Sequence, residues 1–241
     1  KSLAYLFPAL LFAIENNTRV VVSTNTINLQ EQIITKDLPN LYKALNEWSP
    51  DFGDVVFSLL KGRDNYLCVR RWIQLINEES ISQEEARVAS KTMVWLQNTT
   101  SGDRSEMNLA FRDMHVWSRM SSAGAVNCPS RIQEACFLRV AREKAESADL
   151  VVVNHALLMR DLIDGGGIIP NYDYLVIDEA HHLEEEATNQ FGSRFSQNAM
   201  EEYLERLGGS HGIYRHMRTF IDQLLTTPRA EVMEPLIHEG E

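Results

Sequence analysis

The stretch YLVIDEAHH, residues 174–182, decides the fold, because an apolar run there changes abruptly into two adjacent carboxylates. Residues 174–177 have the apolar, partly β-branched character of a strand buried on both faces of a parallel sheet. Open α/β sheets bind their ligands at the carboxyl ends of such strands, where Asp178 and Glu179 stand. Nucleotide hydrolysis suits this pair: Asp178 would hold the Mg²⁺ shell, and Glu179 would orient and deprotonate the attacking water. The bland alternative is an acidic cap on the next helix.

The chain begins with Lys1-Ser2, the residue types that end a phosphate-binding loop, and an apolar segment with helical character follows over 3–15. In such a loop Lys1 would contact the β- and γ-phosphates of ATP, and Ser2 would ligate Mg²⁺. Two residues are a weak signal by themselves, and the glycines that would cradle the phosphates are absent. We therefore expect a site for ATP and Mg²⁺ in a chain that is cut within its phosphate-binding loop.

Composition indicates a globular protein, since 44% hydrophobic and 24% charged residues are ordinary values for a folded chain. No apolar run is long enough for a membrane span and no targeting signal is recognisable, so we expect a cytoplasmic protein. The net charge of −11 argues against a nucleic-acid surface over the whole chain, so phosphate contacts would need local basic clusters. Two candidate clusters, which by default are solvated helix faces, are Lys61, Arg63, Arg70 and Arg71, and Arg131, Arg139, Arg142 and Lys144.

The hydrophobic pattern predicts an α/β fold with a parallel sheet and a helical insertion. The predicted strands are 19–23, 55–60, 150–153 and 174–177, with helices over 3–15 and 27–36, the second ended by Pro39. Residues 61–148 read instead as helices and loops, and they hold all three cysteines. The three glycines at 165–167 predict a flexible turn before the acidic strand.

The cysteines Cys68, Cys128 and Cys136 suggest a metal site within this insertion. Their odd number, without a secretory signal, argues against a disulfide framework. Any one of them is more often a small buried residue, but their confinement to one segment favours an iron–sulfur cluster or, less well, zinc. Both metals prefer four ligands; His115 could supply the fourth, although a lone histidine is more often a surface residue.

Taken together, several segments resemble the DinG/XPD-type superfamily 2 DNA helicases, and in particular the bacterial DinG-like ones. The matching segments, in the family's order, are Lys1-Ser2, VVVSTNTINLQEQIITKDLP (20–39), KGRDNYLC (61–68), ACFLRVAREKAESADLVVVNHALL (135–158) and LVIDEAHHLEEEAT (175–188). The resemblance implies a RecA-like P-loop motor domain, formed by residues 1–60 and 149–190. It also implies an iron–sulfur-domain-like insertion over 61–148 and the beginning of a helical arch-like domain over 191–241.

By the same resemblance, the protein would be an ATP-dependent helicase that moves 5′ to 3′ along single-stranded or forked DNA in repair. Ser23, Thr24 and Thr26 would contact the DNA backbone with support from Gln30, since hydroxyls suit sequence-independent phosphate binding. His181 would couple the ATP state to a second RecA-like domain that is missing here, so the fragment alone would be inactive. Cluster-bearing relatives use four cysteines, whereas this chain has three, so a 4Fe-4S cluster would have an incomplete ligand set.

Two other functions are compatible with the sequence. The first is a P-loop ATPase that is not a helicase, which the segment 20–39 disfavours because a nucleotide switch needs no strand-contacting motif. The second is a metal-bearing nucleic-acid-binding module whose ATPase residues are vestigial. Hydrolysis that is independent of DNA would favour the first, and hydrolysis that is insensitive to Glu179→Gln would favour the second.

Overall fold

The chain divides into two compact units, Lys1–Phe191 and Gly192–Glu241. The computed structural model describes residues 1–48, 54–125, 128, 135–192, 200, 204, 207–208 and 213–226. In the second unit it describes one long helix, α12 (Ile213–Thr226), so most of the predicted arch-like segment lies outside the described residues. None of the described helices is long and apolar enough to cross a membrane.

The first unit is built on a four-stranded parallel sheet with the strand order β2-β3-β1-β4. The strands are β1 (Val20–Thr24), β2 (Phe57–Leu59), β3 (Leu150–Asn154) and β4 (Tyr174–Ile177). Val20 at the start of β1 pairs with the first residue of both β3 and β4, so these three strands run in step. Their carboxyl ends therefore meet at one edge of the sheet. The expected α/β fold with a parallel sheet is confirmed.

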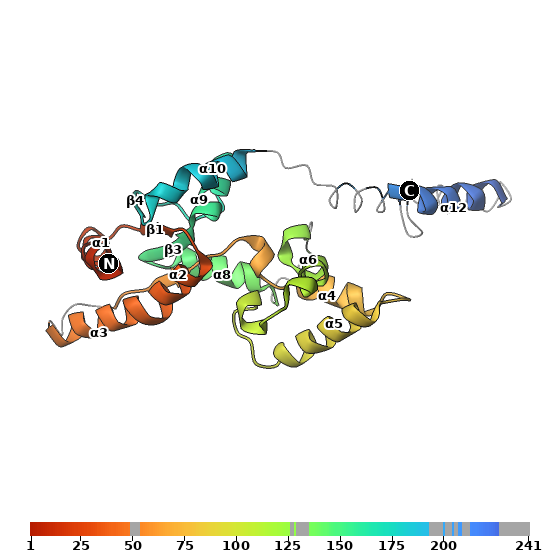
Figure 1. Ribbon diagram of the computed structural model, residues 1–241. Coiled ribbons are helices and arrows are strands. Elements are labelled where there is room, and N and C mark those ends of the chain that lie inside the picture. Colours follow the sequence, from red (N-terminus) through yellow and green to blue (C-terminus); the bar gives the residue numbers. More distant parts are fainter. Residues whose placement is uncertain are drawn as a thin grey trace, which may run out of the picture. The chain divides into compact units, whose positions relative to one another are not determined.

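Helices cover both faces of the sheet, which makes three layers (Figure 1). On one face, α1 (Ser2–Asn16) and α3 (Leu38–Trp48) pack on alternate strand residues such as Val20 and Val22. On the other face, α8 (Phe137–Glu146), α9 (His155–Ile163) and α10 (Leu183–Phe191) pack on the intervening residues, Val21 among them. The alternation of side chains along a strand thus divides one apolar run between two cores.

The prediction that Pro39 ends a helix is wrong. The helical path continues from α2 (Ile27–Gln32) through a π-helical segment, η1 (Ile33–Asp37), into α3. The π turn takes up an extra residue just before the proline. Pro39 then stands in the first turn of α3, where a residue without an N–H group is tolerated.

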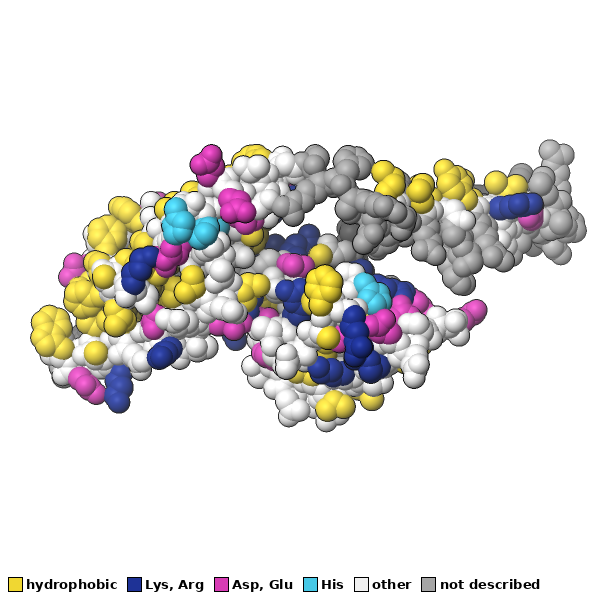
Figure 2. Space-filling view, viewed as in Figure 1, with side chains coloured by type: hydrophobic (Ala, Val, Ile, Leu, Met, Phe, Trp, Pro, Cys, Tyr) yellow, Lys and Arg dark blue, Asp and Glu magenta, His cyan; other side chains and the backbone are white. Residues whose placement is uncertain are grey.

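The strand β4 is not buried on both faces, which corrects a second expectation. It is the outermost strand and pairs only with β1 among the described residues. The exposed fractions of Tyr174, Leu175 and Ile177 are 48%, 39% and 36%. Hydrophobic side chains gather around α1 and β4 on the molecular surface (Figure 2), and the rings of Phe12 and Tyr174 lie 4.6 Å apart there. This part of the sheet therefore presents an apolar edge to solvent.

The inserted segment forms a lobe with its own core, and α4, α5 and α6 lie together apart from the strands (Figure 1). Its helices are α4 (Val69–Ile76), α5 (Gln83–Trp95) and α6 (Met114–Met120), joined by the short helices η2 (Arg63–Asn65), η3 (Arg104–Met107), η4 (Phe111–Asp113) and η5 (Ser122–Gly124). Among the described residues Trp117 is the largest fully buried side chain, and it packs with Leu67 and Val88. The predicted insertion 61–148 includes α8, but Ala145 of α8 packs in the core on one face of the sheet and not in the core of the lobe.

We expect Trp117→Ala to destabilise the lobe by about 3–5 kcal/mol, because it leaves a large cavity in the lobe's own core. The substitution also removes the indole N–H that donates to the Asp64 carbonyl at 2.6 Å. Urea unfolding followed by circular dichroism would measure the loss. Trp48→Ala is the control, since Trp48 is 77% exposed and its removal should change stability by less than about 0.5 kcal/mol. Equal effects of the two substitutions would contradict this account of the core.

Candidate functional site

The first residue of the chain and the acidic pair after β4 lie together at the carboxyl edge of the sheet. The Lys1 ammonium contacts the Glu179 carboxylate, and its Nζ lies 3.7 Å from Asp178 Oδ1. The Asp178 N–H donates to the Ser23 carbonyl at 2.8 Å, so the pairing of β4 with β1 continues into the site. Strand pairing therefore sets the position of the carboxylates, and residues 178 positions apart in sequence meet there.

Two further side chains, Tyr5 and Asp37, lie at this site, and the sequence patterns did not predict them. The Ser2 hydroxyl donates to Asp37 Oδ2 at 2.5 Å, and the Tyr5 hydroxyl donates to Asp178 Oδ2 at 3.1 Å. Burial and the neighbouring Asp178 carboxylate raise the pKa of Tyr5, which keeps its hydroxyl protonated as a donor. The sequence does contain a hint of both residues. Tyr5 stands one helical turn after Lys1, and Asp37 lies within the segment 20–39 that resembles the helicase motif.

The oxygen atoms at this site fit Mg²⁺ bound jointly with a nucleotide. Mg²⁺ in phosphoryl-transfer sites takes one or two protein oxygens and completes its shell with water and phosphate oxygens. The Ser2 hydroxyl and the carboxylates of Asp37 and Asp178 are ligands of this kind. The described residues contain no group of three His, Cys, Asp or Glu side chains placed to hold a metal alone. The site therefore suits a shared ion rather than an all-protein cage.

Glu179 has an unusual backbone conformation at the point where chemistry is expected. Its φ of 53° and ψ of 42° lie in the left-handed region, which is uncommon for residues other than glycine. Strained positions of this kind cluster at functional sites, where the surrounding structure holds them in place. The hydrogen bond from Lys1 lowers the pKa of Glu179 and outweighs partial burial, which acts in the opposite direction.

His181 lies at the surface in the short helix η6 (Ala180–His182). Its side chain is 66% exposed, and its Nδ1 lies 3.5 Å from Glu179 Oε2. The ring packs against that of His182, with the two centroids 4.0 Å apart. His181 thus stands beside the acidic pair without being buried against the following helix.

The four residues expected to contact DNA divide into one exposed and three buried side chains. Ser23, Thr24 and Gln30 are all 0% exposed, so in this conformation their side chains are not available for direct contact with a DNA strand. Thr26 is exposed, and its hydroxyl accepts the Leu29 N–H at 3.2 Å as the cap of α2. Only Thr26 of the four is thus placed for direct contact.

A buried histidine joins this segment to the acidic pair, and it too was missed. The Ser23 hydroxyl and His155 Nδ1 are 2.7 Å apart, and the His155 ring is fully buried at the start of α9. Burial lowers the pKa of His155, while the backbone of Asp178 and Glu179 close to the ring acts to raise it. The imidazole therefore lies between the end of β1 and the end of β4. Its sequence signal was a histidine directly after an apolar strand, in VVVNH.

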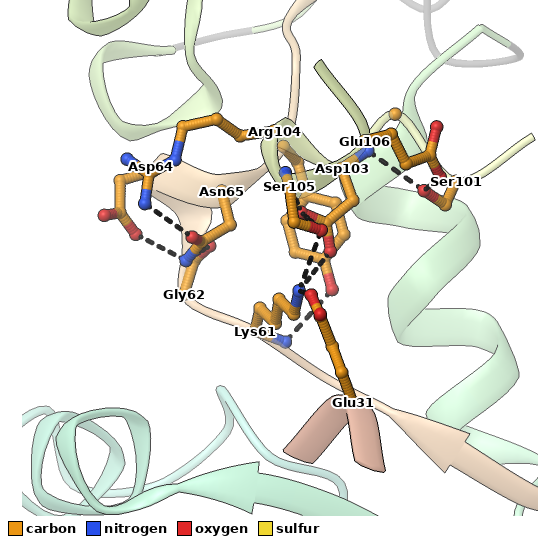
Figure 3. A network of polar contacts seen from close by, with 12 residues as sticks. Glu31, Lys61, Gly62, Asp64, Asn65, Ser101, Asp103, Arg104, Ser105 and Glu106 are labelled. Atoms are coloured by element: carbon orange, nitrogen blue, oxygen red, sulfur yellow. Dashed lines mark hydrogen bonds and ion pairs between the residues drawn. The ribbon is translucent and has the colours of Figure 1, made fainter. Parts of the chain in front are cut away.

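Lys61 is buried in an ion-pair network that holds the lobe against α2 (Figure 3). Its Nζ lies 2.6 Å from Asp103 Oδ2 and 2.8 Å from Glu31 Oε1, and its side chain is 2% exposed. The Lys61 N–H also donates to the Tyr66 hydroxyl at 3.0 Å. The interpretation of Lys61 as part of a phosphate-binding cluster is therefore wrong, because both of its charge partners are internal. The network instead connects the lobe to the helix that follows Thr26.

The other members of the basic clusters are placed differently. Arg71 donates to the carbonyls of Ser118 and Ser121 and so serves the lobe's own structure. Arg139 pairs with Glu143 one turn later on α8. Arg131 lies outside the described residues.

The cysteines do not gather into a metal site in the described part of the chain. Cys68 is buried before α4, Cys136 stands before α8, Cys128 is half-buried, and all three are free thiols. No three metal-binding side chains come together among the described residues, and the ring of His115 is exposed, with Nδ1 2.7 Å from the Arg112 carbonyl oxygen. In the described part of the chain these residues do not fit the expected 4Fe-4S cluster.

Several known proteins are similar in sequence to this chain over most of its length. No family model matches the chain. The sequence is 36% identical over 208 residues to the ATP-dependent helicase DinG of Mycobacterium tuberculosis, covering 78% of this chain and 31% of that protein. The chain is a homologue of the DinG- and YoaA-type ATP-dependent DNA helicases.

Other relatives have similar coverage. The ATP-dependent DNA helicase YoaA of Haemophilus influenzae is 33% identical over 236 residues, covering 94% of this chain and 34% of that protein. The protein named 3′-5′ exonuclease DinG of Bacillus subtilis is 33% identical over 221 residues, covering 90% and 23%. The chain thus spans about a quarter to a third of the length of the DinG and YoaA homologues that it matches.

We expect Lys61→Met to destabilise the first unit by about 3–5 kcal/mol, because it leaves the buried carboxylate of Asp103 without its partner. Urea unfolding measures the loss. The matched control is Lys43→Met, whose ion pair with Glu47 is exposed and should contribute less than about 0.5 kcal/mol. Adding Asp103→Asn to Lys61→Met should recover part of the loss. A double variant no more stable than Lys61→Met would argue against an unpaired charge as the cause.

For His155→Phe we expect weaker stimulation of ATP hydrolysis by single-stranded DNA, with hydrolysis in the absence of DNA retained. The reason is that the ring links Ser23, in the strand leading to Thr26, with the backbone at the acidic pair. Steady-state rates with and without DNA in the full-length protein would show the effect. His155→Gln, which keeps a polar group facing Ser23, should restore part of the stimulation. A proportional loss of both rates would indicate a merely structural role.

Proposed function

We propose that this chain forms part of the motor of an ATP-dependent DNA helicase and carries one half of its ATP site. The supporting observation is the meeting of Lys1 and Ser2 with Asp178, Glu179 and their partner Asp37 at one edge of the sheet. These are the residue types that phosphoryl transfer requires, and the carboxyl edge of a parallel sheet is where such ligands bind. The helicase homologues make DNA the partner of choice.

In the proposed mechanism each side chain has one task. Bound Mg²⁺ would neutralise charge on the phosphates, and Ser2 and Asp178 would hold it, with Tyr5 fixing the orientation of Asp178. Lys1 would contact the β- and γ-phosphates, and Glu179 would orient the attacking water and accept its proton. His181 would report the nucleotide state to a second motor domain, because its exposed ring lies next to Glu179.

The contact between Lys1 and Glu179 suggests how nucleotide binding activates the base. With Lys1 beside it, the lowered pKa of Glu179 makes its carboxylate a weaker proton acceptor. When ATP arrives, its phosphates would draw the Lys1 ammonium away, since they carry more negative charge than one carboxylate. The pKa of Glu179 would then rise toward its ordinary value just when a base is needed.

Four finer properties follow from the resemblance and are part of the same proposal. The motor would move 5′ to 3′ along a single strand, which a helicase assay on substrates with one overhang of either polarity would test. Residues 61–148 would act as an accessory domain of the motor, and residues 191–241 as the start of an arch-like domain. Residues 1–241 alone would not hydrolyse ATP, because arginines of a second RecA-like domain would be needed to stabilise the transition state.

We expect Glu179→Gln in the full-length protein to lower kcat for DNA-stimulated ATP hydrolysis at least about a hundredfold, because it removes the general base. The KM for ATP should change little, since Lys1 and Ser2 still bind the phosphates. The control is Glu185→Gln, an exposed glutamate on α10, which should retain the wild-type rate. Unchanged hydrolysis by Glu179→Gln would favour a vestigial site. Hydrolysis indifferent to DNA in the wild-type protein would favour an ATPase that is not a helicase.

A further inference from the structure

The carboxylate of Asp37 lies beside the proposed nucleotide site, and its hydrogen-bond donors are neutral. The residue is 9% exposed, and its Oδ2 accepts the Ser2 hydroxyl at 2.5 Å and the Gln32 side-chain amide at 3.2 Å. No lysine, arginine or histidine in the described part of the chain forms an ion pair with it. A carboxylate buried among neutral donors alone is costly, so its place calls for a functional reason.

The other three buried aspartates that the structure describes have evident structural roles. Asp103 and Asp113 each form an ion pair with a basic side chain. Asp161 accepts the backbone N–H groups of two residues in the turn after α9, at 2.7 and 3.0 Å. Asp37 instead accepts the hydroxyl proton of Ser2, the residue proposed to hold Mg²⁺.

The π-helical turn η1 places Asp37 at this position. At its end the Leu38 N–H donates to the Ile33 carbonyl, five residues earlier, and both side chains enter the core that they share with α1. Without the additional residue that a π turn accommodates, the helix would rotate by about 100° between the two, and only one could face this core. Asp37 directly precedes Leu38 and thereby meets the first turn of α1. Such turns inside helices are frequent at functional sites.

A serine that binds Mg²⁺ through its oxygen keeps its proton, and this proton needs an acceptor. Asp178 Oδ2 accepts the Tyr5 hydroxyl at 3.1 Å, whereas the Ser2 hydroxyl donates to Asp37. An acceptor at this place turns the free lone pairs of the Ser2 oxygen toward the ion and makes that oxygen more basic. Carboxylates do the same for metal-binding histidines.

We propose that Asp37 is a positioning residue for Mg²⁺ binding, which acts through the Ser2 hydroxyl and does not touch the ion. The proposal rests on the proposed function, because that function makes Ser2 a ligand of Mg²⁺. Asp37 sets the orientation of the Ser2 side chain, and Gln32 holds Asp37 in turn. The charge of Asp37 also favours a cation next to Ser2.

The test is the binding of a fluorescent, non-hydrolysable ATP analogue to the full-length protein, measured by anisotropy in Mg²⁺ and in EDTA. Asp37→Ala should weaken binding in Mg²⁺ at least about tenfold, the usual loss when the partner of a metal ligand is removed. Binding in EDTA should not change, because Lys1 would still contact the phosphates. Asp37→Asn should lose less, since its amide oxygen can still accept the Ser2 proton.

A double-mutant cycle tests whether Asp37 acts through Ser2. In a Ser2→Ala protein, Asp37→Ala should weaken binding no further, because the hydroxyl that it positions is already gone. The control is Lys36→Ala, at an exposed position in the same π turn, which should bind the analogue as the wild type does in both conditions.

An equal loss in Mg²⁺ and in EDTA on Asp37→Ala would mean that Asp37 only supports the fold, and it would overturn the proposal. A full additional loss in the Ser2→Ala protein would mean that Asp37 acts on the ion directly, with the same consequence. In both cases tighter binding by the wild type in Mg²⁺ than in EDTA leaves the proposed function intact. If Mg²⁺ does not tighten binding by the wild type, the proposed ATP site falls and this inference falls with it.

Discussion

Parallel pairing of β1 with β3 on one side and β4 on the other is the constraint on which the rest of the structure depends. Because the three strands run in step, the chain leaves each of them at the same edge. The acidic pair, His155 and the path to Thr26 follow directly from those exits. Helix α1 packs on a face of the same sheet and so places Lys1 at that edge as well. One ladder of backbone hydrogen bonds thereby sets the geometry of a site whose members are far apart in sequence.

The lobe depends on a different kind of interaction. Its apolar core around Trp117 would hold it together in any orientation, so hydrophobic burial alone does not fix how it attaches. The ion pairs of the buried Lys61 with Asp103, which is also buried, and with the partly exposed Glu31 do so, because they are directional and a buried ammonium is costly to leave unpaired. A buried ion pair is weak evidence for added stability. Here its value lies in fixing the lobe relative to α2.

Local patterns were sufficient to predict most of the sheet. Short apolar runs correspond to β1 and β3, because burial between two helical layers demands such runs. The apolar run of β4 also forms a strand of the sheet, although its side chains are largely exposed. The sequence does not reveal that β4 lies at the edge, since exposure depends on neighbours that other segments supply. The ion pairs of Lys61 and the contact of Ser23 with His155 could not be predicted from the sequence for the same reason, since the partners come from distant segments. The partners of Lys61 lie 30 and 42 positions away. Motif chemistry anticipated that Lys1 and Glu179 belong to one site, whereas Tyr5 and Asp37 required the fold.

The apolar edge at β4 has a practical meaning for anyone handling residues 1–241 by themselves. Among the described residues β4 pairs with β1 on one side only, so the backbone groups along its other side have no strand partner there, beside exposed Tyr174, Leu175 and Ile177. Unpaired strand edges of this kind are templates on which a second copy can add a strand, and nearby aromatic surface strengthens such self-association. Low solubility of the isolated piece would then reflect intermolecular strand pairing and not misfolding. A charged residue in place of Leu175 would reduce this self-association.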